Sequence, residues 1–177
     1  MYVTLQQLAE SPGATELAQV ASDSFGAIVD AALMDATLRG ADRSAWSAGD
    51  IAAADDAAAR VSNEIANAGS LIDGYLARRY ALPLSPIPAI LTTWAIAIVR
   101  YRLHTDRITD PRTDPVARDY QQAIGFLTQV ANGQFSLGLE DPTLQPPAVG
   151  EININAGRKV FGVDTACDDA YGTGRGF

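Results

Sequence analysis

The chain contains one histidine, His104, and one cysteine, Cys167. Nucleophilic catalysis needs a serine or cysteine beside a histidine that a third group orients. The sequence shows no such set around His104, and Cys167 has no neighbour at the spacing of metal ligands. We therefore expect His104 to have a helix-end or surface role, and we expect no enzyme activity, metal site or cofactor.

Two glycine- and aspartate-rich stretches near the C-terminus look at first like ligand sites. Three aspartates within Asp164–Asp169 could bind a divalent ion, but the spacing and the bidentate glutamate of a calcium loop are missing. Gly172–Gly176 looks like a phosphate loop, but it lacks the lysine and hydroxyl ending and a following helix. An acidic helix face at Asp55–Asp56 and Glu64 is predicted to be solvated, because nothing in the sequence would separate the pKa values of these carboxylates.

Arg79 is the charged residue with the most open interpretation. It continues an apolar helical stripe four residues after Tyr75, so it could stack on that ring or reach a carboxylate of a neighbouring chain. Alternatively, its stem packs while its guanidinium reaches water. A pocket of Tyr75, Arg79 and Tyr101 could bind a carboxylate or phosphate, which would make the chain a small ligand-binding module.

The composition is that of a globular protein with an acidic surface. The 177 residues are 47% hydrophobic and 19% charged, with a net charge of −8. A free-standing nucleic-acid binder would need a basic patch, whereas an acidic chain can let DNA pass without holding it. The single cysteine excludes an internal disulfide. No signal peptide is expected, and the apolar run Ala89–Val99 is too short to span a membrane.

Periodicity and capping residues predict an all-α fold, a small bundle of about four to five helices. Two short helices are expected before residue 23, separated at Ser11–Gly13, and another over Phe25–Leu38. Asp50 is expected to cap the longest helix, which should run from Ile51 to about Arg79, because its apolar residues recur every three or four positions.

Three prolines between positions 83 and 88 predict a stiff, extended corner, since proline lacks an N–H donor and restricts the residue before it. The helix that follows, up to Thr105, is apolar on nearly all sides, which is typical of the centre of a bundle or a subunit contact. Asp114, Pro115 and Gly133 mark the start and end of the last helix.

The composition changes after the last helix. We expect a helical domain over residues 1–138 and an extended C-terminal arm over 139–177 that becomes ordered on a partner. Within the arm, the alternation in EININAGRKVF (residues 151–161) is the pattern of a short β-hairpin.

An ordered set of residues around the proline corner carries a family resemblance. It reads Ile72-Asp73-Gly74-Tyr75-Leu76, then Arg79-Tyr80, Leu82-Pro83-Leu84 and Pro88. This pattern resembles a family of small proteins from Mu-like bacteriophages over Met1–Ser22 and Asn67–Leu139. Asp23–Ala66 looks longer than the usual connection of the family and is interpreted as an extension. The positions of the family-like core and corner are Ile72, Tyr75, Leu76, Arg79, Tyr80, Pro83, Pro88, Trp94, Tyr101, Tyr120 and Leu127.

The resemblance implies a structural virion protein, similar to the all-helical head–tail connectors, also called adaptors. Such proteins form a homo-oligomeric ring, commonly of twelve copies, in the neck of the virion, and double-stranded DNA passes through the ring. The implied partners are the portal protein and a tail-completion or tail-terminator protein, with no membrane involved and with assembly in the host bacterial cytoplasm.

Charged loops and the C-terminal arm are the expected contacts with those partners. The candidate interface residues are Arg43, Asp50, Arg78, Arg107, Arg112, Ile152, Ile154, Val160, Phe161, Arg175 and Phe177. An alternative is that the chain is itself a tail-completion or tail-terminator protein. Terminators are usually built on β-sheet, so a mainly helical fold would count against that alternative.

Overall fold

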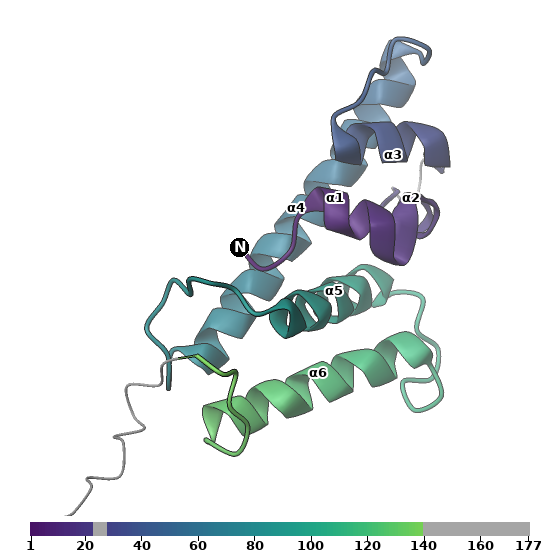
Figure 1. Ribbon diagram of the computed structural model, residues 1–177. Coiled ribbons are helices and arrows are strands. Elements are labelled where there is room, and N and C mark those ends of the chain that lie inside the picture. Colours follow the sequence, from purple (N-terminus) through teal and green to yellow (C-terminus); the bar gives the residue numbers. More distant parts are fainter. Residues whose placement is uncertain (23–27, 140–177) are drawn as a thin grey trace, which may run out of the picture. The chain divides into compact units, whose positions relative to one another are not determined.

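The computed structural model describes residues 1–22 and 28–139, and every regular element in this part of the chain is helical (Figure 1). The prediction of an all-α fold is therefore confirmed, whereas the predicted hairpin lies outside the described residues. The elements in chain order are α1 (Leu5–Leu8), the π-helical turn η1 (Ala9–Gly13), α2 (Ala14–Ala21), α3 (Ala31–Arg39), α4 (Ala48–Leu76), α5 (Ala89–His104) and α6 (Pro115–Ala131).

Two helix starts differ from the sequence prediction. Helix α3 starts at Ala31, after Asp30, whose carboxylate accepts hydrogen bonds from the amides of Ala32 and Leu33 at 2.9 and 3.0 Å. Helix α4 is capped by Ser47 rather than Asp50. The Ser47 hydroxyl accepts from the Asp50 amide and donates to the Asp50 carboxylate. The cap at Ser47 therefore satisfies the amide of Asp50, whereas a cap at Asp50 would satisfy an amide about three residues later in the chain.

The apolar stripe of α4 forms one side of the core. The buried positions of α4 are Ala54, Ala57, Val61, Ile65, Ala68, Ile72 and Leu76. At the end of the stripe Leu76 is fully buried, while Tyr75 is only partly buried. Helix α5 packs against α2, α4 and α6, which agrees with its nearly uniform apolar surface. Burial of each large aliphatic side chain contributes roughly 1.5–3 kcal/mol.

The stretch 23–66 supplies part of this core rather than a separate extension. Helix α3 packs against α2 and α4, and its Leu33 and Met34 are almost completely buried. The first half of α4 contributes Ala54 and Val61, which are not exposed at all. Removing this stretch would therefore open the core that α2 covers.

Helix α6 starts and ends where its sequence predicts. The Asp114 carboxylate accepts from the amides of Val116 and Ala117 at 2.7 and 3.3 Å, and Pro115 is the first helical residue. After α6, Gly133 has a φ of +80°, a conformation that glycine adopts without the strain of a side chain. The chain then turns back so that Phe135 and Leu137 pack against the core.

Candidate interaction surfaces

The proline corner between α4 and α5 exposes large apolar side chains. Leu82, Ile87 and Ile90 are 36–40% exposed and Met1 is 77% exposed. Met1, Leu82 and Ile87 also line a shallow hollow of about 300 Å³. We call Met1, Leu82, Ile87 and Ile90 the corner surface. Gathered apolar side chains on a protein surface are typical of a binding site, so this surface is the strongest candidate for a protein contact.

The N-terminus is fastened beside this surface by Tyr2. Tyr2 is buried, and its hydroxyl donates a hydrogen bond to the Asp73 carboxylate on α4. Burial raises the pKa of the Tyr2 phenol above its ordinary value, and the hydrogen bond and negative charge of Asp73 raise it further. The contact holds Met1 next to the corner.

This contact predicts a loss of stability at high pH. As the pH rises above about 10, the Tyr2 phenol of the unfolded chain loses its proton while the folded chain keeps it. The unfolded state then binds fewer protons than the folded state, so the free energy of unfolding should fall. Urea unfolding at pH 9 and pH 11 should show a larger fall for the wild type than for Tyr2→Phe. Equal falls in the two proteins would contradict the role given to Tyr2.

Arg79 and Tyr80 anchor the start of the corner to the end of α6. Arg79 is 8% exposed; its Nη1 donates to the carbonyl oxygen of Val130 at 3.3 Å, and its guanidinium carbon lies 5.8 Å from the centre of the Tyr80 ring. The Tyr80 hydroxyl accepts from the Leu137 amide at 3.1 Å. The interpretation in which the Arg79 guanidinium reaches water is therefore wrong, because the side chain is buried with its guanidinium beside Val130 and Gly133.

A second hollow, of about 620 Å³, lies between α3 and the first half of α4. Its apolar lining includes Leu33, Trp46 and Ala57, and the exposed side chain of Ile28 also lines it. Its charged residues are Asp30, Asp50, Asp56 and Arg60. We call it the acidic hollow. An apolar lining with an excess of carboxylates suits an apolar segment that carries a positive charge.

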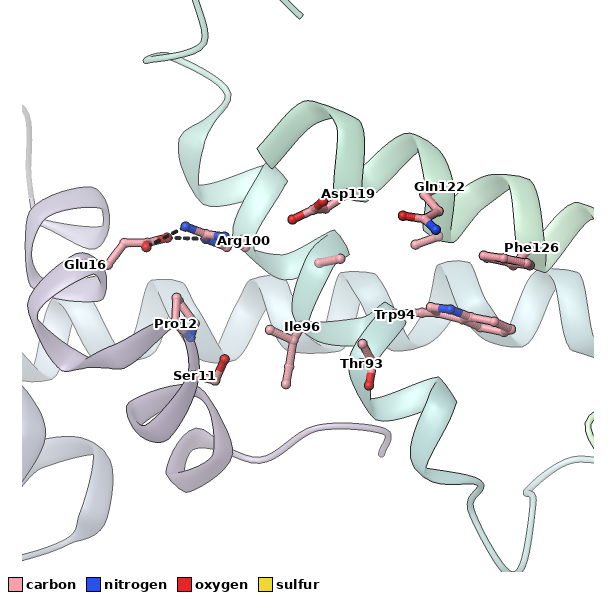
Figure 2. Close-up of a pocket in the computed structure, with 12 residues that line it drawn as sticks. Ser11, Pro12, Glu16, Thr93, Trp94, Ile96, Arg100, Asp119, Gln122 and Phe126 are labelled. Atoms are coloured by element: carbon pink, nitrogen blue, oxygen red, sulfur yellow. Dashed lines mark hydrogen bonds and ion pairs between the residues drawn. The ribbon is translucent and has the colours of Figure 1, made fainter. Parts of the chain in front are cut away.

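A third hollow, of about 520 Å³, lies among η1, α2, α5 and α6, and Figure 2 shows its lining. One end is aromatic: the Trp94 and Phe126 rings stack at 5.6 Å between centres, and Phe135 lies 6.1 Å from Trp94. These three rings join α5, α6 and the segment that follows α6.

The other end of this hollow is an ion pair (Figure 2). Arg100 donates two hydrogen bonds to Glu16, at 2.5 and 2.8 Å, and this bonding to the Glu16 carboxylate raises the pKa of Arg100. His104, the last residue of α5, has its Nε2 3.4 Å from the Glu16 carboxylate and its Nδ1 2.8 Å from the Arg100 carbonyl oxygen. His104 therefore lies at a helix end. Its contact with Glu16, together with the Glu16–Arg100 ion pair, holds α2 against α5.

Two carboxylates of the predicted acidic face have partners on other segments. Asp55 accepts a hydrogen bond from Arg43, and Glu64 accepts one from Arg102 of α5. The Asp55 side chain is still 52% exposed, in agreement with the prediction of a solvated face, whereas the Glu64 side chain is only 25% exposed. Asp56 remains on that face and lines the acidic hollow.

The other predicted interface residues are spread over several segments. Arg78, Arg107 and Arg112 are exposed, and Arg107 donates to the Gln19 carbonyl oxygen at 2.5 Å. Arg43 lies in the segment between α3 and α4 and pairs with Asp55, whereas Asp50 lies in the first turn of α4 and pairs with Ser47. Six predicted residues lie outside the described part of the chain: Ile152, Ile154, Val160, Phe161, Arg175 and Phe177.

The residues of the predicted ligand pocket have separate contacts. The Tyr101 ring stacks on Tyr120 at 4.1 Å, whereas Arg79 reaches Val130. Neither Tyr75, Arg79 nor Tyr101 lines any of the hollows described above or a further one of about 320 Å³ beside Tyr2. Among the described residues, no group of three or more metal-ligating side chains is placed to hold a metal ion. No helix in this part of the chain is long and apolar enough to cross a membrane.

The exposed apolar residues of these surfaces have no periodic signal in the sequence. Ile87 and Ile90 lie beside prolines, where no helical pattern indicates exposure. Trp46 lies in an irregular polar segment. A large apolar side chain outside a helical stripe is the sequence feature that could have identified Ile87, Ile90 and Trp46 as surface residues.

Fold and surfaces together define a small all-α protein in which charged side chains join helices and apolar side chains gather at an exposed corner. The chain belongs to the family described as Bacteriophage Mu, Gp36, whose sequence profile matches residues 2–156. The resemblance to a Mu-like bacteriophage family is thus confirmed, and the matched span includes the stretch 23–66.

Two curated proteins are similar in sequence to this chain. The Mu-like prophage FluMu protein gp36 of Haemophilus influenzae is 38% identical over 108 residues, which cover 61% of this chain and 74% of that protein. Gene product J of Escherichia phage Mu is 31% identical over 93 residues, which cover 52% of this chain and 62% of that protein.

Proposed function

We propose that this chain is a structural virion protein of a Mu-like phage, a head–tail connector subunit that forms a ring between portal and tail. The corner surface is the observation that carries the proposal. Four exposed apolar side chains gather at one corner of a well-packed helical core, where burial against another protein would remove them from water. Membership of a Mu phage family supplies the virion context.

Ring assembly fits the charge of the chain. A contact between two different surfaces, repeated around an axis, closes into a ring when the rotation fits. The resemblance to head–tail connectors implies twelve copies. The net charge of −8 disfavours tight binding of phosphates, so DNA could pass through such a ring without being held. In this proposal the protein is not an enzyme, and its partners are the portal and a tail-completion protein.

The helical fold supports the connector over the tail-terminator alternative, since terminators are usually built on β-sheet. The separate contacts of Tyr101 and Arg79 likewise weaken the proposal of a ligand-binding module. The connector therefore remains the function that these observations support best.

The mass of the purified protein in solution tests this proposal. Light scattering should show small species when the 18.7 kDa chain is alone, and a ring-sized species when the portal protein of its phage is added. We expect the ring because the portal presents a circular template that raises the local concentration of the bound copies, which favours contacts between neighbours. A stable monomer that ignores the portal would overturn the connector proposal.

A further inference from the structure

We propose that neighbouring copies meet head to tail, with the corner surface of one copy seated in the acidic hollow of the next. The inference rests on the proposed function, because it names the two surfaces that join subunits of the ring. The occupant of the acidic hollow is thus a second copy of this chain.

The two surfaces match in their apolar parts. Leu82 and Ile87 project from a stiff corner. The acidic hollow is large enough for such side chains, and its lining includes Ile28, which is 66% exposed, and the partly exposed Trp46. Seating the corner there would cover apolar atoms on both copies, which is the main favourable contribution to protein association.

The two surfaces also match in charge. The acidic hollow contains three carboxylates and one arginine, whereas exposed Arg78 lies four residues before Leu82. Asp30 and Asp50 already accept hydrogen bonds from helix starts. Within the described part of the chain, neither Asp56 nor Arg78 has a hydrogen bond or ion pair from its side chain. Asp56 in the acidic hollow and Arg78 near the corner in sequence are therefore available for a contact between copies.

Charge also favours the head-to-tail contact over a symmetric dimer. Two acidic hollows face to face would bring six carboxylates together. Like charges across an interface weaken binding, whereas opposite charges favour it. Contact between unlike surfaces is therefore favoured.

Because the acidic hollow and the corner surface lie at different ends of α4, each copy that binds can bind a further copy. The acidic hollow uses residues 49–60 of this 29-residue helix, and the corner follows its last residue, roughly 25–40 Å further along the axis. One copy cannot fill its own hollow, so each contact leaves a free corner and a free hollow. Addition continues until a ring closes or a filament grows.

Charge reversal tests the pairing of Arg78 with Asp56. In the presence of portal, Arg78→Glu and Asp56→Arg should each reduce the ring fraction at least tenfold, measured by light scattering. The double variant, which restores opposite charges, should recover most of it. Arg118→Glu, at an exposed site on α6, should assemble like the wild type. Circular dichroism should show unchanged helix content in each variant.

Cross-linking provides an independent measurement. In a Cys167→Ser background, one protein carries Ile87→Cys and another carries Ala53→Cys, a residue of the acidic hollow. Mild oxidation in the presence of portal should give a disulfide dimer from the mixture and from neither protein alone. A ring that forms without the mixed dimer and without rescue by the double reversal overturns this inference and leaves the connector proposal standing. A wild-type chain that forms no ring overturns the connector proposal itself.

Discussion

Replacing Trp94 with alanine should lower the free energy of unfolding by about 3–5 kcal/mol, the range for large aromatic side chains in protein cores. Trp94 is 5% exposed and stacks on Phe126 with an angle of 8° between the rings, while Phe135 packs against both. The substitution would open a cavity where α5, α6 and the following segment meet. Urea unfolding followed by circular dichroism would measure the loss.

Two further variants make this result specific. Ile90→Ala removes an apolar side chain that is 39% exposed on the same helix, so it should change monomer stability by about 0.5 kcal/mol or less. A double-mutant cycle of Trp94→Ala with Phe126→Ala should show a coupling of about 0.5–1.5 kcal/mol. A loss below about 1 kcal/mol for Trp94→Ala would show that the aromatic cluster does not hold α5 on α6.

Replacing Arg79 with alanine should lower the free energy of unfolding by about 2–3 kcal/mol. The guanidinium is buried, its hydrogen bond to Val130 involves a charged donor, and such bonds contribute about 1.5–3 kcal/mol. The stem of the side chain also contributes packing that alanine would lose. Denaturation by urea at neutral pH, fitted to a two-state transition, measures this loss.

Arg78 offers a matched control for Arg79. The two arginines are adjacent, but Arg78 is exposed, so Arg78→Ala should leave monomer stability within about 0.5 kcal/mol of the wild type. Arg79→Met should fall between wild type and Arg79→Ala, since it keeps much of the stem and loses the hydrogen bond. Similar losses for Arg78→Ala and Arg79→Ala would contradict the structural role given to Arg79.

The neighbouring residues Arg78 and Arg79 thus have different roles at the corner. Arg79 fastens the end of α4 to the end of α6, which sets the position of the corner surface. Arg78 is available for a second copy. A change at Arg79 should therefore appear in the unfolding of the monomer, whereas a change at Arg78 should appear in assembly.

The sequence by itself determined most of the helices. The periodicity of α4 identified its buried face as far as Ile72, and Asp114, Pro115 and Gly133 marked the limits of α6. These features are local: a helix buries one side because residues three and four apart share a face, and a cap bonds to amides two or three residues away. The first residues of α3 and α4 could not be predicted, because the polar segments before them contain more than one side chain that could cap the helix.

The tertiary structure alone decided which side chains meet. Glu16 and Arg100 are 84 residues apart, and the partners of Asp55, Glu64 and Arg79 likewise lie on other segments. Periodicity reports which face of a helix is covered but not which helix covers it, so pairing, burial of Arg79 and exposure of the corner surface could not be derived. They depend on how the helices pack together, and that packing places the two surfaces proposed to join the ring.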